Sequence, residues 1–239
     1  MDEQGRQALA PAGALRMGLY AGSPTSFVAD AGTGEAKGVG HDLGLALARH
    51  LGIAFEPVVF KRPAEVLEAA KAGRIDLAFT NATPARAKDL DFTPTVLAIE
   101  LGYLVPAGSP IADATAVDAP GVRVGVSAGS TSEGVLAREL RQARLVAVVS
   151  LEAAGQWLAR GELDAFATNK AILHEMADGL AGSRVLAGRW GLESLALGIP
   201  KGREAGLAVL LEFAAAAAAE GLVERAVARS GLRGTATPS

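Results

Sequence analysis

Arg86 is the residue whose type and position most directly suggest chemistry in this sequence. It closely follows Thr83 and Pro84, a pair typical of a helix start, with threonine as the N-cap and proline at the first helical position. Arg86 would then lie in the first turn, where a cation is unfavourable by ~0.3–1 kcal/mol unless an anion bridges the guanidinium and the free backbone N–H groups. The pattern predicts an anion site. The alternative is a surface ion pair with Asp89 or Asp91.

A buried parallel strand is predicted immediately before this site. Residues 75–80 are mostly apolar, and Gly73 bounds them, which favours a strand buried on both faces over a helix. The run 73–81, GRIDLAFTN, is echoed by residues 161–169, GELDAFATN, and both runs end in Thr-Asn. Ligands of open α/β sheets bind beyond the carboxyl ends of the strands. Two such units facing each other would therefore place both Thr-Asn corners on one cleft.

The elements that position these corners alternate along the chain. The first unit is predicted to contain strands at 15–20, 53–60, 75–80 and 99–105, with helices at 42–51 and 64–72. After a stretch rich in proline and glycine, the second is predicted to contain strands at 122–126, 145–149, 163–168 and 195–199, with helices at 130–143, 151–160 and 170–177. The alternation predicts parallel α/β sheets. Residues 204–229 are predicted to form a helix that is interrupted at Gly221 and packs back on the first unit.

The composition is that of an ordinary globular protein. The 239 residues carry a net charge of −3, with 50% hydrophobic and 21% charged residues. Basic residues are scattered, so we expect no nucleic-acid partner, and the alanine run 214–219 is far too short to span a bilayer. The absence of cysteine excludes disulfides and thiolate chemistry. The first residues lack the pattern of a signal peptide, which fits a cytoplasmic protein or a mature chain without its leader.

Neither a serine hydrolase nor a metalloenzyme is well supported by the sequence. Residues 125–129, GVSAG, match the nucleophile elbow of serine hydrolases, but after Ser127 the chain offers only His174 as a base, with Asp164 as the acid. We interpret the match as a chance one. The remaining histidines, His41 and His50, do not form a cluster with metal-ligand spacing, so we expect no metal and no cofactor.

Three segments resemble family 3 extracellular solute-binding proteins, the receptors of polar amino-acid ABC transporters. They are GVGHDLGLALARHLG at 38–52, AGRIDLAFTNATPARAKDLDFTP at 72–94, and VGVSAGST with the downstream GELDAF. The resemblance implies an α/β protein with the type II periplasmic-binding fold, in which two lobes flank a central cleft and are joined by two crossover strands, here near 103–106 and 197–200. The implied first lobe comprises residues 1–105 and 198–239, and the second comprises residues 106–197.

The resemblance also implies the ligand site. Arg86 matches the arginine that grips the ligand's carboxylate, Asn81 matches a position that assists it, and Ser130 with Thr131 matches the opposing helix start. Nine ligand-binding residues are expected in all: Tyr20, Ser23, Thr80, Asn81, Thr83, Arg86, Ser130, Thr131 and Asn169. Ser130 and Glu133 also form a capping-box pattern on their own terms.

Four positions depart from the family pattern, one of them Gly40, which replaces an acidic residue of the usual GxDxD pattern, although Asp42 is retained. Asn169 stands where the family usually has an aspartate that pairs with the ligand's ammonium group, and Ser23 and Pro63 stand where aromatic residues commonly enclose the ligand. Tyr20 or Phe27 would have to substitute for those aromatic residues. The departures retain a carboxylate clamp and weaken the case for an ordinary α-amino acid.

The expected function is that of a binding protein, not an enzyme. It would trap a small carboxylate, an amino acid or related organic acid, by hinge closure and pass it to the permease of an ABC importer. We expect a periplasmic monomer without stable membrane insertion, whose leader is absent from this chain. Glu133 or Glu152 could restore an ammonium partner. The alternative is an enzyme similar to cyclohexadienyl dehydratase, which would need a general acid such as Glu133, Glu152 or Glu175.

Overall fold

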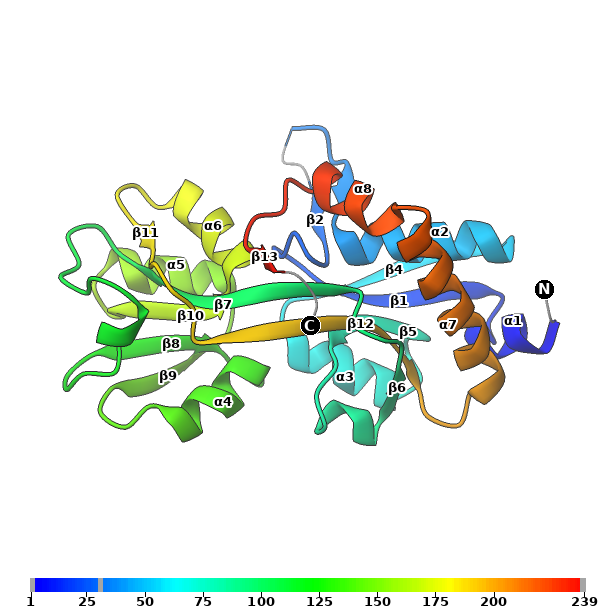
Figure 1. Ribbon diagram of the computed structural model, residues 1–239, viewed down its shortest axis with the longest axis horizontal. Helices are drawn as coiled ribbons and strands as arrows, with labels where there is room; N and C mark the ends of the chain where they lie inside the picture. The colour runs from blue at the N-terminus through cyan, green and yellow to red at the C-terminus, as the bar shows by residue number, and fades with distance from the viewer. Residues whose placement is uncertain (1–2, 30–31, 237–239) are drawn as a thin grey trace.

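Two α/β lobes lie side by side and are joined by two long strands that run across the middle of the molecule (Figure 1). The computed structural model describes residues 3–29 and 32–236. The joining strands are β7 (Leu97–Val105) and β12 (Gly191–Pro200), which pair antiparallel over residues 97–101 and 191–195. The predicted fold class is confirmed. The paired stretch precedes the crossings implied at 103–106 and 197–200, and the lobe boundaries at residues 105 and 198 stay a prediction.

The first lobe, called lobe I below, appears on the right of Figure 1. Its helices are α1 (Glu3–Leu9), α2 (Val39–Leu51), α3 (Pro63–Lys71), α7 (Glu204–Ala219) and α8 (Leu222–Arg229). Its strands are β1 (Ala14–Tyr20), β2 (Val28–Ala29), β3 (Ala36–Lys37), β4 (Ala54–Phe60), β5 (Leu77–Asn81) and β6 (Leu90–Phe92), and the short β13 (Thr235–Ala236) pairs with β7. The strands β4, β1 and β5 are parallel neighbours, as the alternation of strands and helices predicts.

Lobe II appears on the left of Figure 1. It contains α4 (Thr131–Glu139), α5 (Leu151–Ala159), α6 (Lys170–Gly179), β8 (Arg123–Ser127), β9 (Arg144–Val148), β10 (Ala165–Asn169) and β11 (Arg184–Val185). The strands β10, β8 and β9 are parallel neighbours, and β10 pairs antiparallel with β7. Because β5 also pairs antiparallel with β12, one curled sheet continues through both lobes in the order β4-β1-β5-β12-β7-β10-β8-β9.

The repeated Gly-x-x-Asp of the two sequence echoes has the same structural role in each lobe. Asp76 accepts hydrogen bonds from Nε and Nη2 of Arg16 at 2.8 and 2.7 Å. Asp164 accepts from the same two atoms of Arg123 at 2.8 and 2.9 Å. Each arginine lies at or near the start of its lobe's first strand, so each aspartate fixes the strand that leads toward the cleft. Asp76 is fully buried and also accepts from Arg203 at 3.1 Å.

The prediction of a helix after Thr83 and Pro84 is wrong. Thr83 does accept a hydrogen bond from the N–H of Arg86 at 3.3 Å, but only a single 3-10 turn, Arg86–Lys88, follows. The chain then enters β6, which pairs with β12. Pairing with a distant strand therefore outweighs the local helix signal, and Arg86 does not lie in the first turn of an α-helix.

The helix predicted at 130–143 is four residues too long, since α4 ends at Glu139. Asp118 stops it, because its carboxylate accepts hydrogen bonds from the backbone N–H groups of Arg141, Gln142 and Ala143 at 2.8–3.0 Å. These groups therefore satisfy their hydrogen-bonding capacity outside a helix.

The break predicted at Gly221 is confirmed. Gly221 adopts a left-handed backbone with φ of +68° between α7 and α8, and the two helices meet at a bend of 71°. Leu210, Phe213 and Ala217 of α7 join the core around β1 and α2, as predicted. Within residues 3–29 and 32–236, no single helix is long and apolar enough to cross a membrane; only the bent α7–α8 pair passes that test of length and composition.

Candidate functional site

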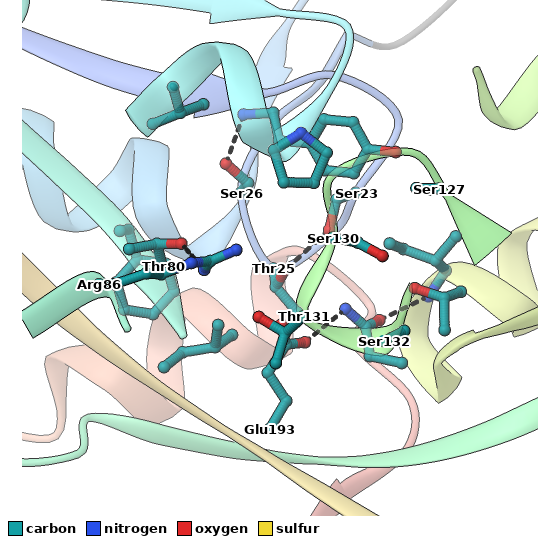
Figure 2. Close-up of a pocket in the computed structure, with 18 residues that line it drawn as sticks. Ser23, Thr25, Ser26, Thr80, Arg86, Ser127, Ser130, Thr131, Ser132 and Glu193 are labelled. Atoms are coloured by element: carbon teal, nitrogen blue, oxygen red, sulfur yellow. Dashed lines mark hydrogen bonds between the residues drawn. The ribbon is translucent and has the colours of Figure 1, made fainter. Parts of the chain in front are cut away.

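A cavity of about 60 Å³ lies where the carboxyl ends of the strands of both lobes converge. Lobe I supplies its serines and threonines from the loop after β1 and from β5, and lobe II supplies them from the end of β8, the start of α4 and the end of β10 (Figure 2). The lining residues are Tyr20, Ser23, Thr25, Ser26, Pro63, Val66, Phe79, Thr80, Arg86, Ser127, Ser130, Thr131, Ser132, Thr168, Asn169, Ile172, Glu193 and Leu195. Seven of the nine predicted site residues are among them.

Arg86 is the cationic group of this cavity. It is 7% exposed, and its Nη1 donates to Oγ1 of Thr80 and, at 3.4 Å, to the carbonyl of Asn81. The surface alternative is wrong, because Asp89 pairs with Lys71 and Asp91 pairs with Lys201. In the described part of the chain, no carboxylate lies within ion-pair distance of Arg86. Burial lowers the pKa of the guanidinium, because the charged form is removed from water. An incoming anion would therefore be strongly favoured.

The opposing wall is the start of α4. Ser130 is the N-cap, with its Oγ accepting from the N–H of Glu133 at 3.1 Å. Glu133 completes a variant of the predicted capping box by accepting from the N–H of Gly129 at 2.6 Å. Thr131 begins the helix and lines the cavity. The hydroxyls and the positive end of α4 therefore face the side of the cleft that holds Arg86.

Asn169 and Glu193 form the next part of the wall. Asn169 caps α6, with its Oδ1 accepting from the N–H of Ile172 at 3.1 Å, and its Nδ2 donates to Oε2 of Glu193 at 2.8 Å. Glu193 lies on the connecting strand β12, is largely shielded from solvent, and lines the cavity. Burial raises the pKa of Glu193, an effect that the hydrogen bond from Asn169 and the charge of Arg86 partly offset.

The sequence did not single out Glu193. It lies just before the predicted strand 195–199, in a stretch whose pattern points to no site. Neither acid that was considered as an ammonium partner lines the cavity, because Glu133 caps α4 and Glu152 lies on the exposed surface of α5, 3.4 Å from Gln156. Glu175 interacts with Arg233 instead. Only the pairing of β12 with β7 and β5 brings Glu193 to the cleft.

Tyr20 and Ser23 both line the cavity, as expected. Ser23 is 1% exposed and shares a hydrogen bond of 2.7 Å with Thr25. The Tyr20 hydroxyl is buried near Ser127 but makes no hydrogen bond of normal geometry, and burial raises the pKa of Tyr20 to about 12. This orphaned hydroxyl is a further polar group available to a ligand. Phe27 packs against His41, 5.9 Å between ring centroids, and does not line the cavity.

The other two predicted residues have supporting positions. Asn81 uses its Oδ1 to accept from the N–H of Ser194 at 3.1 Å, which ties β5 to β12. Thr83 lines a neighbouring hollow of about 570 Å³ that also touches Arg86, Ser130 and Thr131. Both residues therefore shape the surroundings of Arg86 rather than the inner cavity.

The geometry does not assemble a serine hydrolase triad. Ser127 lines the cavity, whereas Asp164 is paired with Arg123, and no hydrogen bond joins Ser127 to His174 among the described residues. In the same part of the chain, no group of three or more His, Asp or Glu side chains could hold a metal ion.

Comparison with protein families gives one match. The model for bacterial extracellular solute-binding proteins, family 3, matches residues 15–229. The chain belongs to this family. A search of curated proteins gives no match.

Solved structures agree with the family assignment at the level of the fold. A solute receptor for L-cysteine of Neisseria gonorrhoeae is 24% identical, with a TM-score of 0.83 over 94% of this chain and 92% of that one. An amino acid ABC transporter substrate-binding protein of Streptococcus pneumoniae, bound to L-arginine, is 18% identical, with a TM-score of 0.83 over 94% and 97%. An ancestral amino acid-binding protein, a precursor of cyclohexadienyl dehydratase, is 23% identical, with a TM-score of 0.81 over 94% and 98%.

Proposed function

We propose that this solute-binding protein captures a small carboxylate, an amino acid or related organic acid, for an ABC importer. The observation that carries the proposal is Arg86, a buried guanidinium without a carboxylate partner in a cavity lined by both lobes. A planar guanidinium binds a carboxylate through two parallel hydrogen bonds. Nη1 donates to Thr80 and to the Asn81 carbonyl, which leaves the rest of the guanidinium for the ligand.

Binding and closure of the lobes are one event in this proposal. The ligand contacts Arg86 from lobe I and the start of α4 from lobe II only when the cleft is closed, so it shifts the population toward the closed state by that difference in affinity. The lobes meet closely at the rim, where a Cβ on Gly129 of lobe II would lie 2.7 Å from the Cβ of Ala64 of lobe I. The closed protein would then dock on the importer's permease as a periplasmic monomer.

The test is a ligand screen by thermal unfolding and calorimetry over amino acids, dicarboxylates and amine-free organic acids. We expect at least one carboxylate to bind and to reduce the radius of gyration measured by X-ray scattering. The control is the primary amide of the same ligand, which retains its size and loses the charge that Arg86 recognises. Equal affinity for acid and amide would contradict the proposal, as would binding without compaction.

A second candidate is a dehydratase acting in the same cleft. The observation that favours it is the buried carboxyl of Glu193 with its raised pKa, since a general acid must hold its proton near neutral pH. Glu193 replaces Glu133, Glu152 and Glu175 as the acid that such a reaction would use. Turnover of prephenate or arogenate, abolished by Glu193→Gln, would favour this enzyme over the binding protein.

A further inference from the structure

The residues lining the cavity include two charged groups of opposite sign, Arg86 and Glu193. Neither makes a direct ion pair with the other or with any described residue, although each influences the titration of the other through space. The other lining residues are hydroxyl-bearing, amide or apolar. Two buried charges that face one cavity without direct contact are costly, and a ligand that carries the complementary pair of charges offsets both costs at once.

We propose that Glu193 binds the ammonium group of a compact zwitterion whose carboxylate lies at Arg86, and that Asn169 positions Glu193 for this role. The inference rests on the proposed function and assigns the negative end of the site to the connecting strand β12. The ligand is therefore an amino acid and not an amine-free acid, although Asn169 itself offers no negative charge.

The hydrogen bonds of Asn169 explain why position 169 carries an amide. Its Oδ1 is committed to the N–H of Ile172 at the start of α6, so its Nδ2 is directed at Glu193, 2.8 Å away. An aspartate here would cap the helix equally well but would place a second carboxylate against Glu193, and when two carboxylates share a site the pKa of one of them is strongly raised. Asn169 supplies a donor that stabilises the ionised form of Glu193 and fixes its orientation.

The volume of the inner cavity favours a small ligand. The inner cavity measures about 60 Å³, well below the roughly 150 Å³ of a cavity that binds benzene, and it adjoins the hollow of about 570 Å³ that also touches Arg86, Ser130 and Thr131. Glycine, alanine, serine and β-alanine suit this space better than arginine or glutamine. The orphaned Tyr20 hydroxyl and the serines around it provide further partners for a small polar group.

The test compares matched ligands and matched variants by calorimetry near pH 7.5. Wild-type protein should bind a small amino acid at least about 30-fold more tightly than the hydroxy acid of the same skeleton, such as L-alanine against L-lactate, because the amine-free acid leaves Glu193 buried without a cation. Glu193→Gln should weaken the amino acid by about 30- to 3,000-fold and leave the hydroxy acid unchanged or tighter. Glu152→Gln, on the exposed surface of α5, is the control and should change neither affinity.

The double variant Asn169→Asp with Glu193→Gln exchanges the two groups of this hydrogen bond, so that position 169 carries the carboxylate and position 193 carries the amide. It should recover at least about tenfold of the lost affinity for the amino acid, which a purely structural role of Glu193 would not produce. Tighter binding of the hydroxy acid by wild type, or full retention of amino-acid affinity in Glu193→Gln, would overturn the inference while leaving the carboxylate receptor standing. Absence of binding by every carboxylate would overturn the proposed function and this inference with it. The wild-type comparison remains decisive if a variant fails to fold.

Discussion

Replacing Arg86 with methionine should remove ligand-induced stabilisation while leaving the fold intact. Methionine fills much of the space of the arginine stem. In the variant, the Thr80 hydroxyl and the Asn81 carbonyl lose the hydrogen bonds that Arg86 donates. Thr80 still lines the hydroxyl-rich cavity, and Asn81 still pairs with β12. No buried carboxylate is left without a directly bonded partner, because Arg86 makes no ion pair among the described residues.

The size of the effect follows from the burial of the guanidinium. Truncating one partner of a buried, hydrogen-bonded charge pair costs about 2–5 kcal/mol of binding free energy, or about 30- to 3,000-fold in affinity. At a ligand concentration about 100 times the wild-type Kd, binding stabilises the protein by about 2.7 kcal/mol. That raises Tm by about 5–10 °C for a chain of this length. In the variant, the same concentration would stabilise by about 0.9 kcal/mol at the lower limit and by less than about 0.1 kcal/mol at the upper.

The assay is differential scanning fluorimetry with the ligand found in the screen, with Kd measured by calorimetry. Lys88→Met is the matched control, since Lys88 is exposed on the same 3-10 turn as Arg86 and its loss should leave the shift in Tm unchanged. The reasoning is refuted if Arg86→Met retains the wild-type shift, because the carboxylate must then bind elsewhere in the cleft.

Three further outcomes are expected. Affinity for a zwitterion should fall as the pH falls through the raised pKa of Glu193, which lies above the range of an ordinary glutamate, because binding needs the ionised carboxylate. Arg86 stays cationic in this range, and Tyr20 has a pKa of about 12, so neither group contributes to the change. Calorimetry in two buffers should therefore detect proton release on binding that Glu193→Gln lacks. The folding stability of the ligand-free protein should change with pH in the opposite direction, since the raised pKa of Glu193 in the folded state contributes stability at low pH that is lost as the pH rises through that pKa. Asp76→Asn should lower the free energy of unfolding measured in urea by about 3–5 kcal/mol, because Arg16 and Arg203 lose a fully buried partner. Asp164→Asn should lower it clearly less, because the Asp164 side chain is 35% exposed. Equal losses in the two variants would contradict this ranking. Gly129→Ala should weaken ligand binding, because its added Cβ would collide with Ala64 of the other lobe. Gly108→Ala, at a similar φ of +73° but with open space around it, should lower stability alone. Equal effects of the two variants on affinity would exclude the proposed rim contact.

Local signals in the sequence predicted the order of the main strands and helices and the break at Gly221. They also identified Arg86 and the two Thr-Asn corners. These features depend on neighbours in the chain: apolar periodicity, glycine at left-handed positions, and a basic residue beside a turn. The echoed Gly-x-x-Asp runs were visible for the same reason, although their partners Arg16 and Arg123 were not.

Tertiary structure decided how the chain continues after Arg86 and which acid shares its cavity. The helix expected after Pro84 is a single turn, because β6 is drawn to β12, a strand more than a hundred residues further along the chain. The same strand carries Glu193 to the cleft, where Asn169 meets it. The sequence indicated the proposed carboxylate-binding group, Arg86, because that expectation depends on one short segment. The negative end of the site depends on pairing between distant strands, which no local pattern encodes.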